Sequence, residues 1–231
     1  MSEFFHMVLA GNIGAGKTTV SRLLSERLGW RSYVERVDDN PFLADFYQDM
    51  SRWAFALQLT FLANRLEDHR LIAERAESAI QDRSLHEDAL IFARNLYDSG
   101  RMSEGEWRTY RRLYTQMLAL LRPPDLLVYL RRSLAGLLRN IRQRGRDYEA
   151  DIDPAYLERL NAYYEEWIAS RPSERILVVD ADALDFVDGS ADLELLAAQV
   201  LAACPQRELF PSAQASPLAV PADARFALLE P

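Results

Sequence analysis

The residues that most clearly predict chemistry lie near the N-terminus, in the stretch FFHMVLAGNIGAGKTT. An apolar run leads into Gly11, Gly14 and Gly16, which let the backbone turn tightly with its N–H groups facing inward. A helix from Lys17 to Leu28 would place the positive end of its dipole at the same point. The spacing fits the pattern GxxxxGK[ST], in which amides and the lysine hold phosphates and the hydroxyl contacts Mg²⁺. The alternative is an ordinary glycine turn, but the strand-like run before it and the helix after it favour a phosphate-binding loop.

Lys17 is the only lysine of the chain, and the other 26 of its 27 basic residues are arginines. A sequence that uses arginine everywhere else therefore has lysine at the one position inside the glycine-rich loop. A compact ammonium fits between phosphate oxygens, where a planar guanidinium does not replace it. This exception supports the phosphate-binding interpretation.

Carboxylates at the ends of predicted strands indicate where a hydroxyl or a metal ion could be held. Glu35 ends the second apolar run and could accept a hydroxyl proton during phosphoryl transfer. Asp82 ends the third run and resembles the acid that holds Mg²⁺ beside a phosphate loop, usually through water, while Arg83 could reach the transferred phosphate or fix Glu35. The alternatives are a solvated turn at Glu35 and a surface ion pair of Asp82 with Arg83.

A predicted helix from Ser51 to Glu77 carries two polar residues on an otherwise apolar face. Gln58 and Arg65 are seven residues apart, so they share a face about two turns apart, together with aromatic side chains. A bidentate amide and a guanidinium can recognise the edge of a nucleobase. The alternative is that both groups find partners within the protein, as polar groups on an apolar face must.

An arginine cluster follows in the stretch LRNIRQRGRDYE, with Arg139, Arg142, Arg144 and Arg146 close together. In an acidic protein, such a cluster is typical of an anion clamp that closes over phosphates. A solvated helix end is the alternative, because cations favour a helix C-terminus. The glycine-rich loop upstream favours the clamp.

The elements that must position these residues can be predicted from five short apolar runs, at 4–10, 31–35, 79–82, 126–130 and 176–180. Longer segments of helical periodicity separate the runs. This alternation predicts an α/β chain with a five-stranded parallel sheet flanked by helices. Ligands of such sheets gather at the carboxyl ends of the strands, where Glu35, Asp82 and Asp180 stand.

The 231 residues, 49% of them apolar, are enough for one full core. We expect one domain over 1–204. The segment 205–231 changes character: it holds five of the ten prolines, with many Ala and Ser residues, and is typical of an extended tail.

A net charge of −8 and a pI near 5.0 disfavour a nucleic-acid polymer as a partner. The single Cys204 excludes an intramolecular disulfide, and neither a secretory signal nor a long apolar stretch is present. We expect a cytoplasmic protein with no membrane segment. The three histidines, His6, His69 and His86, lack metal-ligand spacing and are interpreted as structural.

In this order, the motifs resemble the deoxynucleoside kinase family, which includes the deoxycytidine, deoxyguanosine and deoxyadenosine kinases. The chain is most similar to the bacterial deoxyadenosine/deoxyguanosine branch. The resemblance runs from GNIGAGKTT to about Cys204 and leaves the tail outside. It implies the P-loop kinase fold with an arginine-rich lid.

On the acceptor side, the resemblance implies roles for single residues. Glu35 in VERV falls at the position of the base that takes the 5′-hydroxyl proton, although Arg36 stands where proline is common. The other substrate contacts that it implies are Tyr47 at the 3′-hydroxyl, Gln58 and Arg65 at the base, Arg83 in DRSLHED, Asp88 beside the base-side arginine, and Glu149 beside Tyr47.

On the donor side, RGRDYE matches the lid, with Arg144 and Arg146 on the phosphates. Asn140 departs from the family, where some members have a further phosphate-binding arginine, and either Arg139 or Arg142 could substitute. The implied ATP contacts are Gly11, Asn12, Ile13, Gly14, Ala15, Gly16, Lys17, Thr18, Thr19, Arg142, Arg144, Asp182 and Phe186, with Thr18 and Asp82 at the metal.

The implied reaction is transfer of the γ-phosphoryl group of Mg·ATP to the 5′-hydroxyl of a deoxynucleoside, in nucleotide salvage. The implied substrate is a purine, deoxyadenosine or deoxyguanosine, with deoxycytidine as an alternative. The implied catalytic residues are Glu35, Arg83, Lys17, Arg144 and Arg146. The resemblance also implies a homodimer through the helical face.

Two other functions fit parts of the pattern. A nucleoside monophosphate kinase of the thymidylate kinase type has the same loop and lid, but it needs a cationic pocket for the acceptor's phosphate. Tyr47, Gln58 and Glu149 suit hydroxyls and a base better. A non-catalytic ATP-binding switch would use the loop alone, and Glu35, Gln58 and Arg65 would then be incidental.

Overall fold

The structure is a computed structural model that describes residues 4–37, 39–146, 149, 152–171, 175–186, 189–204 and 226–229. The strands are β1 (His6–Ala10), β2 (Arg31–Tyr33), β3 (Ala79–Asp82), β4 (Leu126–Arg131), β5 (Ile176–Asp180) and β6 (Phe226–Leu229). The helices are α1 (Lys17–Leu28), α2 (Leu43–Gln48), α3 (Met50–Arg75), α4 (Leu85–Glu87), the π-helix η1 (Asp88–Ala93), α5 (Arg94–Asp98), α6 (Glu104–Leu118), α7 (Leu134–Arg144), α8 (Pro154–Ala169) and α9 (Ser190–Ala203).

The strands form one sheet in the order β2-β3-β1-β4-β5-β6. The first five are parallel, which confirms the five-stranded parallel sheet predicted from the apolar runs. Since the chain leaves β1 between β3 and β4, the loop that follows β1 lies at the point where the order of the strands reverses, the usual ligand position in such sheets.

A sixth strand, β6, was not predicted. It pairs antiparallel with β5, with Phe226 opposite Val179 and Leu229 opposite Ile176. Four residues in a Pro- and Ala-rich segment are too few for a periodic signal, so only pairing to an existing edge identifies the strand. The rest of the predicted tail, 205–225 and 230–231, lies outside the described residues.

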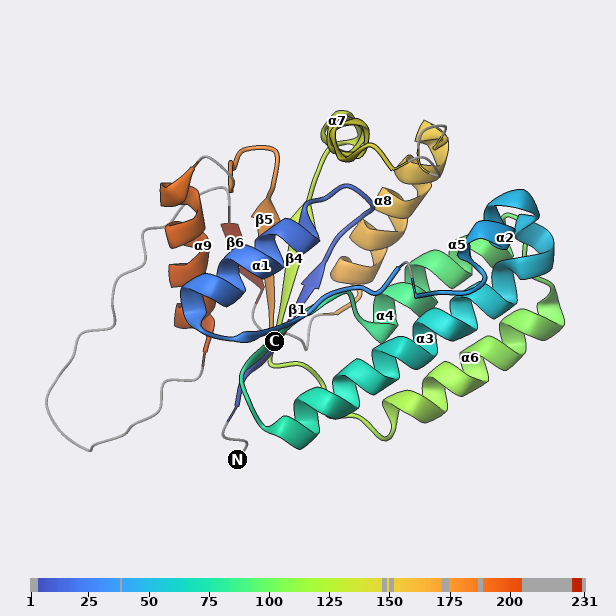
Figure 1. Cartoon of the computed structure of the whole chain (residues 1–231), viewed down its shortest axis with the longest axis horizontal. Helices are drawn as coiled ribbons and strands as arrows, with labels where there is room; N and C mark the ends of the chain where they lie inside the picture. Colours follow the sequence, from blue (N-terminus) through green and yellow to red (C-terminus); the bar gives the residue numbers. More distant parts are fainter. Residues whose placement is uncertain are drawn as a thin grey trace, which may run out of the picture.

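The two faces of the sheet are buried by different helices, as the alternation of a strand requires. From β1, Met7 and Leu9 pack in a cluster with residues of α1, α7 and α9. Val8 and Ala10 point the other way and pack with residues of η1 and α8. Figure 1 shows α1 and α9 on one side of the sheet and α3, α4, α6 and α8 on the other.

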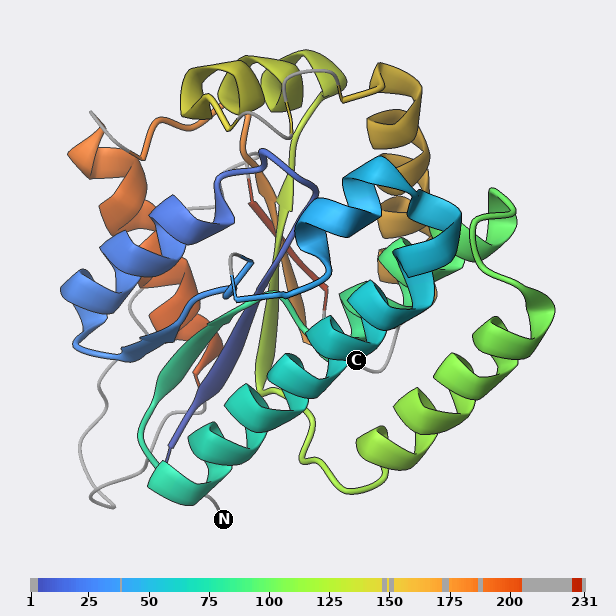
Figure 2. The ribbon, with the colours of Figure 1, turned by 45° about the vertical axis from the view of Figure 1, so that its right-hand side comes forward.

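The helices on the second side have an apolar cluster of their own, away from the sheet. It joins α2, α3, η1 and α6 and includes Leu62, Ala93, Tyr110 and Tyr114. Figure 2 shows the long α3 running alongside α6, in agreement with their contacts. Two aromatic residues of α6, Tyr110 and Tyr114, are thus buried within the chain.

No helix in the part of the chain that the structure describes has both the length and the apolar character needed to cross a membrane.

The glycine-rich loop fits closely under α7. Gly14 has φ +81°, and a Cβ built on it would lie 2.8 Å from the carbonyl oxygen of Leu137 and 2.9 Å from Cγ1 of Ile141. Asn140 reinforces this contact by donating its side-chain amide to the Gly14 carbonyl at 2.8 Å. The position therefore needs glycine both for its backbone conformation and for the space.

We expect Gly14→Ala to lower the free energy of unfolding by about 3 kcal/mol, because a left-handed non-glycine residue and an overpacked backbone contact each cost about 1–3 kcal/mol. Urea denaturation measures this change. Gly100→Ala is the matched control: Gly100 also has a positive φ, but a Cβ there meets nothing within 4 Å. Equal losses in the two variants would contradict the packing argument.

Candidate functional site

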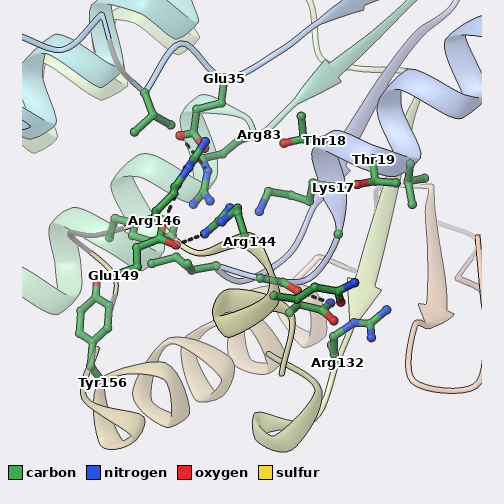
Figure 3. Close-up of a pocket in the computed structure, with 18 of the residues that line it drawn as sticks. Lys17, Thr18, Thr19, Glu35, Arg83, Arg132, Arg144, Arg146, Glu149 and Tyr156 are labelled. Atoms are coloured by element: carbon green, nitrogen blue, oxygen red, sulfur yellow. Dashed lines mark hydrogen bonds and ion pairs between the residues drawn. The ribbon is translucent and has the colours of Figure 1, made fainter. Parts of the chain in front are cut away.

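A cavity of about 850 Å³ opens at the carboxyl ends of the strands, where the glycine-rich loop, α3 and α7 meet. Sixteen sequence-predicted site residues line it: Ile13, Gly14, Gly16, Lys17, Thr18, Thr19, Glu35, Tyr47, Gln58, Arg83, Asp88, Arg144, Arg146, Glu149, Asp182 and Phe186. Figure 3 shows Lys17 and the lid arginines turned toward one another across this space. Residues from distant parts of the sequence thus share one site.

The glycine-rich loop presents a helix start that no side chain caps. Gly16 is the N-cap of α1, with φ 99°, and no side-chain hydrogen bond satisfies the first amides of the helix. Lys17 Nζ donates to the carbonyl oxygens of Gly11 at 2.8 Å and Asn12 at 3.0 Å. Burial, with Arg83 nearby, lowers the pKa of Lys17 to about 8. An anion at this point would satisfy the amides and the lysine together.

Thr18 and Asp82 offer hard oxygen atoms beside the loop. Thr18 Oγ1 donates to Asp82 Oδ2 at 2.7 Å, and the other carboxylate oxygen of Asp82 is buried without a hydrogen-bond partner. Such oxygens suit Mg²⁺, which usually keeps part of its water shell. The pair therefore fits the magnesium position predicted from the sequence.

Glu35 lies between two buried arginines. Its Oε1 is 2.5 Å from Arg65 Nη2 and 3.2 Å from Arg83 Nε. Burial alone would raise the pKa of Glu35, but the positive charges of Arg83, Arg65 and Lys17 outweigh it and lower that pKa to about 2. The carboxylate is therefore ionised at neutral pH and points into the cavity, where Figure 3 shows it beside Arg83.

Arg83 is held in an unusual backbone conformation. Its φ is +73°, in the left-handed region that costs a non-glycine residue about 1 kcal/mol or more. Its amide donates to the Leu9 carbonyl at 3.0 Å, and its guanidinium stacks over Phe92, with 4.1 Å between the guanidinium carbon and the ring centroid. This backbone conformation directs the side chain of Arg83 toward Glu35 at the end of β3.

The α3 end of the cavity has polar atoms that lack partners. Gln58 is only 5% exposed, and its Oε1 makes no hydrogen bond. Arg65, behind the cavity wall, pairs with Asp88 at 3.4 Å as well as with Glu35. Apolar side chains surround these groups: Leu57, Phe61, Phe92 and Leu96. A flat apolar wall with an unpaired amide is what a nucleobase requires.

The lid side of the cavity carries two ion pairs on Glu149. Arg144 Nη2 donates to Glu149 Oε2, and Arg146 Nη1 lies 3.7 Å from Glu149 Oε1. The lid arginines therefore face a carboxylate in this structure, across the cavity from Lys17 (Figure 3).

The structure does not bring Arg142 to the cavity, although the sequence placed it among the ATP contacts. Arg139, Asn140, Gln143 and Arg144 line the cavity from one face of α7, whereas Arg142 is exposed on another face. Of the two candidates to replace the arginine absent at Asn140, Arg139 is thus the better placed. Five further predicted residues are buried but are not part of the lining: Gly11, Asn12, Ala15, Arg65 and Asp82.

The far end of the cavity holds a group that the sequence did not suggest. Arg132 lines it with Asp182 and Phe186, and its side chain is only 9% exposed. Arg132 Nη1 lies 3.8 Å from Asp182 Oδ1, while its Nε is buried without a hydrogen-bond partner. Arg132 directly follows the last residue of β4, a strand-end position that could have singled it out.

No role for Glu87 was predicted from the sequence either. It is completely buried behind the glycine-rich loop, where its carboxyl group accepts the amide of Gly11 at 3.2 Å. The signal in the sequence was the capping-box spacing of Ser84 and Glu87 directly after a predicted strand.

Comparisons with known proteins agree on one family. The model of the deoxynucleoside kinase family matches residues 7–205. The chain is 36% identical to the deoxyadenosine/deoxycytidine kinase of Bacillus subtilis, over 84% of this chain and 90% of that protein. It is 37% identical to a deoxyguanosine kinase of Lactobacillus acidophilus, over 84% and 89% of the two chains.

A solved structure of a deoxyadenosine kinase from M. mycoides, with the products dCMP and dCDP bound, superposes with a TM-score of 0.76 at 30% identity. The match covers 85% of this chain and 98% of that one. The same kinase with bound dATP gives a TM-score of 0.75 at 31% identity, over 85% and 100% of the two chains.

The buried Asp88 gives the site a pH dependence. Burial raises its pKa from 3.8 to about 7, although Arg65 and Arg83 oppose the shift. Between these two values the folded chain holds a proton that the unfolded chain has released, so the free energy of unfolding falls as the pH rises. In Asp88→Asn this contribution is absent.

We therefore expect the free energy of unfolding to fall less from pH 5 to pH 8 in Asp88→Asn than in the wild-type chain. Urea denaturation at both pH values measures it. Asp39→Asn, at an exposed position before α2, should follow the wild type. A difference between wild type and Asp88→Asn that does not change with pH would contradict the shift.

Proposed function

Because the chain belongs to the deoxynucleoside kinase family, we propose that it transfers the γ-phosphoryl group of ATP to the 5′-hydroxyl of a deoxynucleoside, in nucleotide salvage. One observation carries this proposal: a single cavity joins the phosphate loop at Lys17, the ionised Glu35 and the unpaired amide oxygen of Gln58. These are the positions needed for a phosphoryl donor, for an acceptor hydroxyl and for a base. The enzyme is thus a phosphotransferase with an alcohol group as acceptor.

Glu35 would orient the acceptor hydroxyl. A carboxylate with a pKa of about 2 accepts a hydrogen bond readily, but it is too weak a base to deprotonate a free hydroxyl. In phosphoryl transfer the transition state is loose, so the hydroxyl becomes acidic only after its bond to phosphorus has begun to form. Glu35 therefore positions the nucleophile first and takes the proton late.

The remaining charges suit the phosphates. Thr18 and Asp82 are the residues placed to hold Mg²⁺, which when bound would supply positive charge that neutralises the phosphates. Lys17 and Arg83 face the same space, and Arg144 and Arg146 would exchange Glu149 for phosphate oxygens when the lid closes. Most of the rate acceleration would then come from positioning and charge neutralisation.

At the far end of the cavity, Arg132, Asp182 and Phe186 would hold the base of ATP. At the α3 end, Gln58 would bind the nucleoside base, with Arg65 and Asp88 behind it, and Tyr47 with Glu149 would bind the sugar hydroxyl. We propose a purine, deoxyadenosine or deoxyguanosine, as the preferred base. The named activities of the relatives from B. subtilis and L. acidophilus support this choice, and the former also keeps deoxycytidine as a candidate.

The family membership favours this reaction over that of a nucleoside monophosphate kinase or a switch. A monophosphate acceptor would bring its own phosphate to the α3 end, where Gln58, Tyr47 and apolar side chains line the cavity. A switch would not require an ionised carboxylate between the phosphate loop and a base-binding wall. Assays that compare deoxynucleosides with their monophosphates, with ATP and Mg²⁺, separate the three.

We further propose a homodimer that packs through the helical side of the sheet, in the cytoplasm. Exposed leucines within α6 and just after it, Leu113 and Leu120, support an interface on that side, and the single cysteine suits a reducing compartment. Light scattering on the purified chain measures the oligomeric state.

We expect Glu35→Gln to lower kcat by about 100-fold or more, because the loss of a positioned acid–base group typically costs 10²–10⁴-fold. The affinity for the deoxynucleoside should change much less. Steady-state kinetics with ATP and a deoxynucleoside measure both. Glu67→Gln, which removes an exposed carboxylate on α3, is the matched control and should keep normal turnover. Near-normal turnover of Glu35→Gln would refute the assigned role.

We expect Gln58→Ala to raise KM for the deoxynucleoside by about tenfold with a smaller effect on kcat, because each lost hydrogen bond to the base costs about 1–3 kcal/mol. KM for ATP should stay the same. Gln116→Ala, on the outer helix α6, controls for the loss of an amide elsewhere. An equal rise in both KM values would place Gln58 outside the nucleoside subsite.

A further inference from the structure

Behind the phosphate loop, the side chain of Glu87 contacts residues from three parts of the fold. It is 0% exposed and does not line the cavity of the candidate site. Its Oε1 accepts the amide of Gly11, at the end of β1, at 3.2 Å, and its Oε2 accepts the amide of Ser84, after β3, at 2.9 Å. The hydroxyl oxygen of Tyr164, on α8, lies 2.8 Å from Oε1.

The Tyr164 hydroxyl also reaches the loop itself. Its oxygen lies 2.8 Å from the carbonyl oxygen of Gly11. Glu87 thus receives the N–H of the Gly11 residue directly, while the C=O of the same residue is reached through Tyr164. The first residue of the phosphate loop is therefore held at both of its backbone polar groups by side chains that do not face the cavity.

The Tyr164 hydroxyl is the only donor between two acceptors. Glu87 Oε1 and the Gly11 carbonyl oxygen each lie 2.8 Å from its oxygen, and a phenol has one hydrogen to donate. Tyr164 therefore links the carbonyl of the loop to the buried carboxyl group of Glu87. Burial raises the pKa of Glu87, against the opposing charges of Arg83 and Lys17.

The same carbonyl also holds Lys17. Nζ of Lys17 donates to the Gly11 and Asn12 carbonyl oxygens, which keeps the ammonium inside the loop. A phosphate in the loop competes for that ammonium, and Lys17 must then give up these carbonyls. A buried carbonyl oxygen without a hydrogen-bond donor costs free energy. Without a second donor to the Gly11 carbonyl, the release of Lys17 toward a phosphate would therefore be less favourable.

Glu87 also acts on the other side of the loop. Ser84, whose amide it accepts, follows directly on Arg83, the residue with φ +73°. The Glu87 and Ser84 side chains form the capping box that starts α4. Through Ser84, one buried carboxyl group therefore also fixes the turn that places the Arg83 guanidinium at Glu35.

We propose that Glu87 and Tyr164 are positioning residues of the phosphate loop, which hold the Gly11 residue in place when Lys17 leaves its carbonyl for the phosphates of ATP. The proposal rests on the proposed function only for the identity of the nucleotide. It assigns to two residues outside the cavity an effect on the donor nucleotide and not on the nucleoside.

Tyr164→Phe tests this role, because it removes the one donor and keeps the ring. We expect the dissociation constant of Mg·ATP, measured by calorimetry without acceptor, to rise about tenfold, as for one buried hydrogen bond lost. KM for ATP should rise in parallel, and KM for the deoxynucleoside should change by less than about twofold. Calorimetry needs no turnover, so the test holds even if the chain phosphorylates no deoxynucleoside.

Tyr129→Phe is the matched control. Tyr129 stacks on Tyr164, with ring centroids 5.6 Å apart, but its hydroxyl donates to Glu165, away from the loop. This variant should bind ATP like the wild type, and thermal unfolding followed by circular dichroism shows whether each variant is folded. Equal ATP affinities in the two tyrosine variants, or an equal loss of both substrates in Tyr164→Phe, would overturn the proposal.

Glu87→Gln tests the other member of the pair. The two carboxyl oxygens of Glu87 accept the amides of Gly11 and Ser84, and a glutamine side chain keeps only one of these acceptors. We expect the dissociation constant of Mg·ATP to rise in this variant as well. A folded Glu87→Gln variant with the ATP affinity of the wild type would refute the role of Glu87.

Discussion

The burial of Glu35 between two arginines is the interaction on which the rest of the site depends. Removing three ionised groups from water is costly unless opposite charges meet. Glu35 follows β2, Arg65 comes from the middle of α3, and Arg83 follows β3. These three elements must therefore end or cross at one point, and the neighbouring positions of β2, β3 and β1 in the sheet bring that point beside the phosphate loop.

The two sides of the sheet support this group of charges in different ways. On the side of α1 and α9, apolar side chains from alternate strand positions form a core that anchors the loop at the start of α1. On the other side, η1 and α8 cover the sheet, while α3 stands farther out on its own apolar cluster with α6. That separation leaves room for a cavity in which an apolar wall that carries Gln58 faces the charged centre.

Much of the fold and part of the site could be predicted from the sequence, because their signals are local. The parallel strands are short apolar runs, and the phosphate loop is a contiguous pattern ending in the only lysine. Arg132, Glu87 and Tyr164 were not predicted, since their importance arises only where distant segments meet: Tyr164 and Gly11 are 153 positions apart. The strand β6 depends in the same way on its pairing with β5. The period of the helix places Arg142, which was predicted among the ATP contacts, on another face of α7 than Arg139.

The hydrogen bond from Asn140 to the Gly14 carbonyl has a mechanical consequence. Because Ile141 and Leu137 also lie close to Gly14, α7 cannot move away from the loop as a rigid body without breaking these contacts. Any movement of the lid must then be taken up beyond it, at Gly145, whose φ of +66° ends the helix. Arg144 precedes Gly145 and Arg146 follows it. A change in the backbone angles of Gly145 would therefore alter the distance between the two guanidinium groups while α7 stays in place.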